Sequence, residues 1–161
     1  DLAAKFLIGA VRRIYEPGCK HDEMIVLEGA QGSGKSSLLA ALCHNPAWFT
    51  DAVTLNMESK NLIEVTQGRW IVEAPELSRL TGSEVEHVKA LLSRREDIAR
   101  LAYGRDTTAK QRQFIFAGTT NAEQYLQDLT GNRRFLPVKT GTLDIEGLTA
   151  ARDQIFAETV T

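Results

Sequence analysis

The chain has 161 residues, of which 43% are hydrophobic and 25% are charged, a composition that is ordinary for one globular domain with its own core. The formal net charge of −2 excludes a polycation, so binding to nucleic acid would need a local basic patch. The apolar runs are too short to span a membrane, and two cysteines are too few for a disulfide framework.

These limits favour a reduced, cytoplasmic protein without a membrane partner. Cys19 and Cys43 lie near His21 and His44, but their spacing fits no standard zinc finger, and we expect no metal there. Because the chain begins at Asp1 rather than at Met, we expect a fragment of a longer protein, with residues 1–161 forming a single domain.

Hydrophobic periodicity and turn residues predict that helices and strands alternate along the first half of the chain. Pro17-Gly18 ends the first helix, and a helix that follows residues 29–36 stops near Cys43, before Asn45-Pro46. The other elements predicted here are helices over residues 2–16 and 59–66 and strands over residues 24–28, 52–55 and 69–73.

Residues 29–36 form the pattern G-x-x-x-x-G-K-S, the phosphate-binding P-loop, between a predicted strand and a predicted helix. The glycines let backbone N–H groups turn inward around a phosphate, and the positive end of the helix adds to that field. Lys35 is placed to reach the β- and γ-phosphates of ATP, and the Ser36 hydroxyl to ligate Mg²⁺. The predicted nucleotide-binding residues are Gly29, Ala30, Gln31, Gly32, Ser33, Gly34, Lys35, Ser36 and Ser37.

Two acids lie at and just after the end of the next predicted strand, whose last residues are Trp70-Ile71-Val72-Glu73. A nucleotide hydrolase needs one carboxylate to hold Mg²⁺ through water and usually another to orient or deprotonate the attacking water. Glu73 ends this strand and Glu76 follows three residues later, and we assign Glu73 to the Mg²⁺ shell and Glu76 to water activation. The reverse assignment stays open, as does a structural role in which these acids only cap the next short helix.

The second half of the chain continues the alternation. Ser83 and Glu86 have capping-box spacing for a helix that runs to about Ser93. Pro137 suggests that the last strand lies at an edge of the sheet. The remaining predicted elements are strands over residues 113–117 and 134–138 and a helix over residues 148–159.

Polar residues follow the strand predicted at 113–117. Thr119-Thr120-Asn121 comes after Gly118, and an Asn at this place can hydrogen-bond both a γ-phosphate and the attacking water. The same residues are also good turn and cap chemistry for a helix at 122–126. Given the P-loop, we favour Asn121 as a polar sensor of the γ-phosphate.

Two adjacent arginines, Arg133 and Arg134, precede the last predicted strand. If Arg134 begins that strand, neighbouring side chains point to opposite sides, so one could face a partner subunit. Arginine stabilises charge on a transferring phosphoryl group, and both residues are therefore candidates for that role. The alternative is a solvated or structural ion pair.

The segment from Lys89 to Arg112 is basic, and Tyr103-Gly104-Arg105-Asp106 has the turn chemistry of a hairpin tip. A projecting basic segment with one aromatic residue suits a nucleic-acid backbone and a stacked base, although a solvated loop has the same composition. The candidate DNA contacts are Lys89, Arg100, Tyr103, Arg105 and Lys110.

Strands that alternate with helices predict a three-layer α/β fold with a parallel sheet. In such sheets ligands sit at the carboxyl ends of the strands. The P-loop, Glu73 and Asn121 all follow predicted strands, so we expect them to converge on one crevice.

The chain resembles the virulence-associated protein E family of phage and pathogenicity-island proteins, which are P-loop helicase-like ATPases. That family is related to the superfamily-three helicases and the poxvirus-type primase-helicases. The resemblance covers most of residues 24–140, and its most specific parts are Thr119-Thr120-Asn121 and Gly131-Asn132-Arg133-Arg134-Phe135. In chain order, the segments that carry it are residues 27–37, 68–77, 103–105, 117–121 and 130–138.

The resemblance implies an AAA+-like core with strand order 5-1-4-3-2, assembled as a ring, expected to be a hexamer, with ATP bound between subunits. It implies that Asn121 is the sensor, that Arg133 or Arg134 is a trans-acting arginine finger, and that the basic hairpin faces single-stranded DNA. Superfamily-three proteins often carry adjacent acids after the third strand, whereas here Ala74-Pro75 separates Glu73 from Glu76. The roles of the two acids therefore stay open.

Three functions fit these residues. The leading one is the ATP-driven motor of a phage-type DNA helicase or primase-helicase. A small-molecule P-loop kinase would use the same P-loop, but the sequence shows no acceptor-site signal. A nucleotide-dependent loader or scaffold would bind ATP with little turnover.

Overall fold

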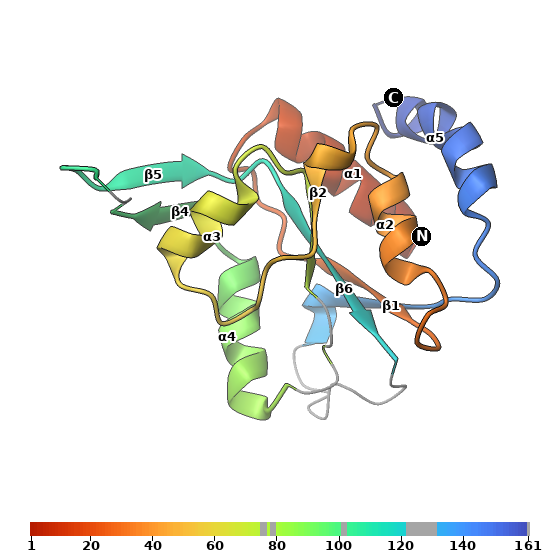
Figure 1. The fold of residues 1–161 in the computed structure, drawn as a ribbon, viewed down its shortest axis with the longest axis horizontal. Helices are drawn as coiled ribbons and strands as arrows, with labels where there is room; N and C mark the ends of the chain where they lie inside the picture. The colour runs from red at the N-terminus through yellow and green to blue at the C-terminus, as the bar shows by residue number, and fades with distance from the viewer. Residues whose placement is uncertain (75–76, 78–79, 101–102, 122–131, 161) are drawn as a thin grey trace.

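The computed structural model describes residues 1–74, 77, 80–100, 103–121 and 132–160 (Figure 1). Its main sheet has five strands, and every neighbouring pair in it is parallel. The strands are β1 (Met24–Glu28), β2 (Phe49–Thr50), β3 (Ile71–Ala74), β6 (Ile115–Thr120) and β7 (Phe135–Lys139). They lie in the order β2-β3-β6-β1-β7, which is the predicted order 5-1-4-3-2 when these strands alone are numbered along the chain.

Helices cover both faces of this sheet, and the predicted three-layer α/β arrangement is confirmed (Figure 1). The helices are α1 (Leu2–Tyr15), α2 (Lys35–Ala41), α3 (Ser59–Thr66), α4 (Gly82–Leu92) and α5 (Ile145–Val160), with short turns η1 (Pro46–Trp48) and η3 (Asn132–Arg134). In the described part of the chain, no helix has the length and apolar character needed to cross a membrane.

The alternation of side chains along β1 divides the core into two clusters. Ile25 and Leu27 join the cluster that contains residues of α1, α2 and α5. Met24 and Val26 join the opposite cluster, which contains residues of α3 and α4. Since successive strand residues point to opposite faces, a central strand between two helical layers must be apolar at nearly every position.

Several predicted bounds differ from the structure. Residues 52–55 form no strand, because the edge strand β2 comes earlier and its register is set by Phe49 opposite Ile71. The capping box of α4 uses Thr81 and Glu84 rather than the predicted Ser83 and Glu86. The Thr81 hydroxyl and the Thr81 backbone N–H both donate to the Glu84 carboxylate. These bonds lower the pKa of Glu84, and the hydroxyl contributes more than the N–H.

The predicted hairpin is confirmed. Strands β4 (Glu96–Ala99) and β5 (Thr108–Gln111) pair antiparallel, form a separate two-stranded sheet and project away from the main sheet (Figure 1). Tyr103 lies at the tip with a positive φ of 63° and a fully exposed side chain. The tip therefore presents an aromatic ring and basic side chains to solvent.

A buried ion pair joins the base of the hairpin to the core. Arg112 donates from Nε and Nη2 to the two carboxylate oxygens of Asp97, each at 2.7 Å, and both side chains are only 2% exposed. Arg112 Nη1 also donates to the Leu91 carbonyl at the end of α4, and its guanidinium lies 5.4 Å from the ring centroid of Phe114. These contacts fix the hairpin to α4 and to the chain that enters β6.

We expect Asp97→Leu to lower the free energy of unfolding by about 3–5 kcal/mol, because it leaves the Arg112 guanidinium buried without its carboxylate. The double variant Asp97→Leu/Arg112→Met should recover most of this loss, since it removes both charges together. Urea denaturation measures both. Glu16→Gln, which breaks the exposed Arg12–Glu16 pair, is the control and should cost less than about 1 kcal/mol. A single Asp97 variant as stable as this control would contradict the expectation.

Candidate active site

The P-loop lies at the carboxyl end of β1, between the ends of two neighbouring strands. The Gly29 N–H donates to the Thr120 carbonyl at the end of β6, and the Thr140 N–H after β7 donates to the Glu28 carbonyl. The Thr140 hydroxyl donates to the same carbonyl at 2.9 Å. The loop therefore starts from a position that three strands define.

Glycines shape the loop in two ways. Gly32 and Gly34 have φ values of 75° and 88°, in the left-handed region that side chains with a Cβ disfavour. Gly29 is different: a Cβ there would collide with the hydroxyl oxygen of Thr140. The motif thus needs glycine for backbone conformation at two positions and for space at another.

The Lys35 side chain is folded back into the loop. Its ammonium group donates to the carbonyl oxygens of Gly29 and Ala30 at 2.8 and 2.7 Å and lies 3.4 Å from the Ser33 hydroxyl. These partners are neutral oxygens, so they do not cancel the positive charge of Lys35. A phosphate oxygen could replace them and would gain an ion pair with the ammonium group.

Glu73 connects the P-loop helix to the sheet. Ser36, in the first turn of α2, donates from its hydroxyl to Glu73 Oε1 at 2.8 Å, and the Thr119 hydroxyl donates to the same oxygen at 2.7 Å. The Glu73 side chain is 1% exposed. Its other oxygen, Oε2, is buried and has no hydrogen-bond partner among the described residues.

This arrangement fits a magnesium site. Mg²⁺ prefers oxygen ligands, keeps several waters and is bound in nucleotide sites by few protein groups. The Ser36 hydroxyl and the Glu73 carboxylate are such groups, and the unpartnered Oε2 could accept a hydrogen bond from a metal-bound water. The convergence of the P-loop with Glu73, expected from their strand ends, is present in the structure.

The remaining site residues are placed less completely. Asn121 is exposed and follows β6 directly, whereas the helix expected at 122–126 lies outside the described residues. Glu76 also lies outside them. Arg133 and Arg134 belong to η3 and not to the predicted strand, which begins at Phe135, so the alternation argument for opposite directions does not apply.

The two arginines differ in exposure. Arg133 is exposed, whereas Arg134 is half-buried and its Nε has no hydrogen-bond partner in the described part of the chain. Because β7 runs parallel to β1, η3 lies at the amino end of β7 and the P-loop at the opposite, carboxyl end of the sheet. Five residues of strand separate these ends by about 15 Å along the chain direction.

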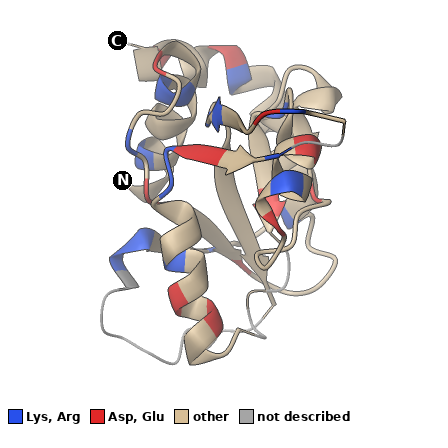
Figure 2. Ribbon diagram, turned by 90° about the vertical axis from the view of Figure 1, so that its left-hand side faces the viewer, with Lys and Arg blue, Asp and Glu red and all other residues tan. Residues whose placement is uncertain are grey.

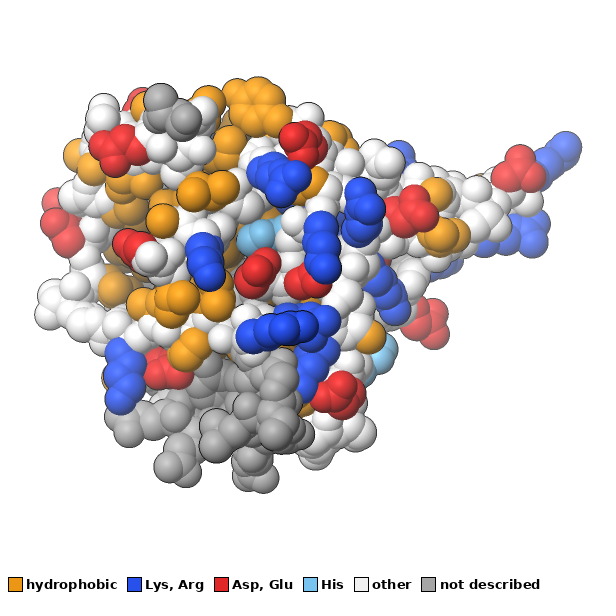
Figure 3. Space-filling model, turned by 180° about the vertical axis from the view of Figure 1, so that it is seen from behind, with side chains coloured by type: hydrophobic (Ala, Val, Ile, Leu, Met, Phe, Trp, Pro, Cys, Tyr) orange, Lys and Arg blue, Asp and Glu red, His pale blue; other side chains and the backbone are white. Residues whose placement is uncertain are grey.

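The candidate DNA contacts divide into two groups. Arg100, Tyr103, Arg105 and Lys110 are exposed and lie on or next to the hairpin, which extends as an arm with basic side chains at its end (Figure 3). Lys89 is not part of this group, because it is buried on α4 and pairs with Glu86 at 2.6 Å. Basic and acidic segments lie side by side when the molecule is viewed from the hairpin side (Figure 2), so the basic character is local.

Two contacts of the site were not predicted from the sequence. Thr119 stood in a recognised polar cluster, but nothing in that pattern indicated a bond to Glu73, which is 46 residues away. Thr140 carries no local signal, because its hydroxyl bonds to the Glu28 carbonyl, 112 residues away in the chain, and lies beside Gly29.

The cysteines take no part in this site. Both are buried, and burial raises the pKa of the Cys43 thiol to about 11, so this thiol is protonated near neutral pH. Within the described ranges, no group of three or more His, Cys, Asp or Glu residues is placed to hold a metal ion.

We expect Gly29→Ala to lower the free energy of unfolding by about 1–3 kcal/mol and to weaken nucleotide binding, because the added methyl group meets Thr140. In a Thr140→Ala background the same change should cost less. Chemical denaturation of the single and double variants measures this coupling. Gly82→Ala is the matched control, since nothing lies within 4 Å of the added methyl group there. Equal costs in both backgrounds would show that Thr140 is not the obstacle.

Comparisons with known proteins agree with this fold. No curated protein matches the chain. The A form apo structure of the NrS-1 C-terminal region is similar with a TM-score of 0.58 and 13% identity, over 96% of this chain and 40% of that one. A second structure of that region gives a TM-score of 0.51 and 15% identity, over 96% and 38% of the two chains.

The chain therefore spans about two fifths of the length of these structures. At 13–15% identity the structural similarity shows a shared fold and nothing beyond it. The family model of the virulence-associated protein E-like domain matches residues 1–161. The match covers the whole chain and agrees with the resemblance drawn from the P-loop and the late Asn and Arg motifs. The chain belongs to the virulence-associated protein E-like domain family.

Proposed function

We propose that this domain is an ATP-hydrolysing motor of AAA+ type that acts on DNA during phage-type replication in the cytoplasm of the host cell. The observation that carries the proposal is the hydrogen bond between the P-loop Ser36 and the buried Glu73. A P-loop hydroxyl and a strand-end carboxylate are the protein groups that hold Mg²⁺ in P-loop hydrolases. The strand order of the main sheet supports the AAA+ assignment.

In this proposal each group has a separate task. The loop N–H groups and Lys35 bind the β- and γ-phosphates of ATP, and Ser36 and Glu73 would hold Mg²⁺, which neutralises charge on the phosphates. Thr119 keeps the Glu73 carboxylate oriented by its hydrogen bond. Asn121, at the end of the neighbouring strand β6, positions the attacking water, and Glu76 remains the candidate for activating it.

We further propose that the site is completed by a neighbouring subunit of a hexameric ring. Arg133 is exposed but lies at the end of the sheet opposite its own P-loop. An arginine so placed can reach a γ-phosphate of another subunit more readily than its own. Arg133 is therefore the preferred arginine finger, whereas Arg134 is half-buried and less available to a partner subunit.

The hairpin is the proposed contact to single-stranded DNA. It projects from the sheet, and Tyr103 and Arg105 are exposed at its tip. Cations bind the phosphate backbone and an exposed ring stacks on an unpaired base. A kinase would need no such arm, and a loader would use it without sustained turnover.

We expect single-stranded DNA to stimulate ATP hydrolysis. Lys35→Ala should abolish hydrolysis with and without DNA, because the phosphates lose their ammonium partner. Glu73→Gln should retain nucleotide binding but lower kcat by about 100-fold, because the proposed Mg²⁺ site loses its carboxylate. Steady-state phosphate release with and without DNA measures these effects, with Arg12→Gln as a surface control. Transfer of phosphate to a small acceptor without DNA would favour the kinase, and tight binding without turnover the loader.

We expect Arg133→Ala to lose hydrolysis while retaining ATP binding, and Arg134→Ala to act mainly on stability. Mixing Arg133→Ala with Lys35→Ala subunits should restore part of the activity, since some sites then combine an intact P-loop with an intact finger. The ATPase rate as a function of mixing ratio measures this complementation. A mixture whose ATPase rate is only the sum of the rates of the two variants alone would argue against a shared site.

A further inference from the structure

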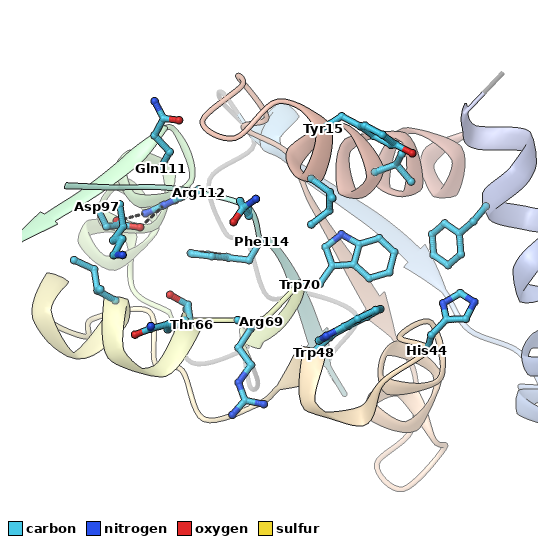
Figure 4. Close-up of a pocket in the computed structure, with 18 of the residues that line it drawn as sticks. Tyr15, His44, Trp48, Thr66, Arg69, Trp70, Asp97, Gln111, Arg112 and Phe114 are labelled. Atoms are coloured by element: carbon cyan, nitrogen blue, oxygen red, sulfur yellow. Dashed lines mark hydrogen bonds and ion pairs between the residues drawn. The ribbon is translucent and has the colours of Figure 1, made fainter. Parts of the chain in front are cut away.

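A cavity of about 570 Å³ opens at the amino ends of β3 and β6 (Figure 4). The P-loop lies at the opposite, carboxyl end of the sheet. Residues of α1, η1, the end of α3, α5 and the base of the hairpin line it. Its volume is that of a small-ligand pocket. None of the residues assigned to phosphate binding lines it, so the proposed ATPase chemistry leaves it without a role.

Aromatic rings form the wall of this cavity. Both tryptophans of the chain, Trp48 and Trp70, line it. The Trp70 indole N–H donates to the Ala10 carbonyl at 2.8 Å. The centroid of the Trp70 ring lies 5.1 Å from that of the Phe156 ring, and the Trp70 and Trp48 rings meet edge-on. Trp70 is thus held rigidly, and it supports the more exposed Trp48.

Part of the aromatic wall faces solvent. Trp48 is 41% exposed and Tyr15 is 73% exposed, and both lie around Trp70 in Figure 4. Ile14 and Val160, two further large hydrophobic residues with high exposure, also line the cavity. Exposed apolar side chains that gather around one cavity are typical of a ligand-binding or interaction site.

The rim of the cavity is polar and carries positive charge. Gln67, Gln111 and Gln113 are exposed, and each amide offers both a donor and an acceptor. Among the described lining residues Asp97 is the one carboxylate, and its charge is already matched by Arg112. Lys110, exposed on β5, adds a cation to this rim.

We propose that this cavity binds an unpaired base of single-stranded nucleic acid. A base has a flat π-surface, donors and acceptors on its edge and an anionic backbone, and the aromatic wall, the amides and Lys110 complement these three features. An apolar peptide has no anionic backbone for Lys110 to bind and, unless it carries aromatic side chains, no flat π-surface for the rings. The proposal rests on the proposed function, because it takes the hairpin's DNA as its ligand.

The position of the cavity supports this ligand. Strand β5 runs from the tip region, where Arg105 and Tyr103 are exposed, to Gln111 at the cavity. Lys110 faces solvent along that path. One strand of nucleic acid could therefore contact the hairpin and place a neighbouring base on the rings.

The two tryptophans report directly on this event. We expect oligo(dT) to quench tryptophan emission at the same concentrations at which anisotropy of a labelled oligonucleotide shows binding. Tyr15→Ala and Trp48→Ala should each weaken oligonucleotide affinity about tenfold, as expected for the loss of one stacking ring. Ile8→Ala is the matched control, because Ile8 is 49% exposed on the same helix as Tyr15 but does not line the cavity. Thermal melts of all three verify folding.

The outcomes separate this inference from the proposed function. Oligonucleotide binding without quenching, and with both cavity variants like wild type, would overturn the cavity site while leaving DNA-stimulated hydrolysis intact. Quenching of tryptophan emission without any ATP hydrolysis would support the cavity site and overturn the proposed ATPase function. If the apolar dye ANS stays bound in the cavity under saturating oligo(dT), the occupant is an apolar partner and the inference fails. Absence of any oligonucleotide binding at low salt also overturns it.

Discussion

The structure depends on a buried carboxylate, Glu73, that must receive hydrogen bonds from two other segments. Burying a charge in a protein core is costly unless it is hydrogen-bonded, and Ser36 and Thr119 supply those bonds. Glu73 shares its sheet face with Ile71, while Val72 points to the opposite core cluster. A shift of one residue in the pairing of β3 would therefore move the carboxylate to the wrong face and separate it from the P-loop.

Strand β6 connects this site to the hairpin. In the segment that leads into β6, Arg112 is paired with Asp97 and Phe114 packs in the core cluster beside α4. At its end Thr119 holds Glu73, from the strand that lies between β3 and β1. Strand β6 is buried along its whole length, so one packed strand joins the segment that follows the hairpin to the Glu73 carboxylate.

Sequence reasoning was most accurate where the signal is local. The strand at 24–28 has the predicted bounds, and the helix predicted to run to Thr66 is present, because a continuous apolar run and a regular helical period depend only on neighbouring residues. The N-cap of this helix is Glu58, so the expectation that Ser59 caps it is wrong. Sequence reasoning was least accurate where the pairing of distant strands decides which residues form a strand. The expected strand at 52–55 is absent, since β3 selects residues 49–50 as its partner. Lys89 looked like part of a basic surface, but the packing of α4 buries it beside Glu86.

The sequence by itself determined the P-loop, because the left-handed conformations at Gly32 and Gly34 are a property of glycine, and the candidacy of Glu73, because an acid ended an apolar strand. It also determined the family to which the chain belongs. Only the tertiary structure decided that Glu73 meets Ser36 and Thr119, that an Asp97–Arg112 pair anchors the hairpin, and that aromatic rings from separate segments line a cavity. These contacts join residues far apart in the chain, and strand order and register, which no local pattern contains, bring them together.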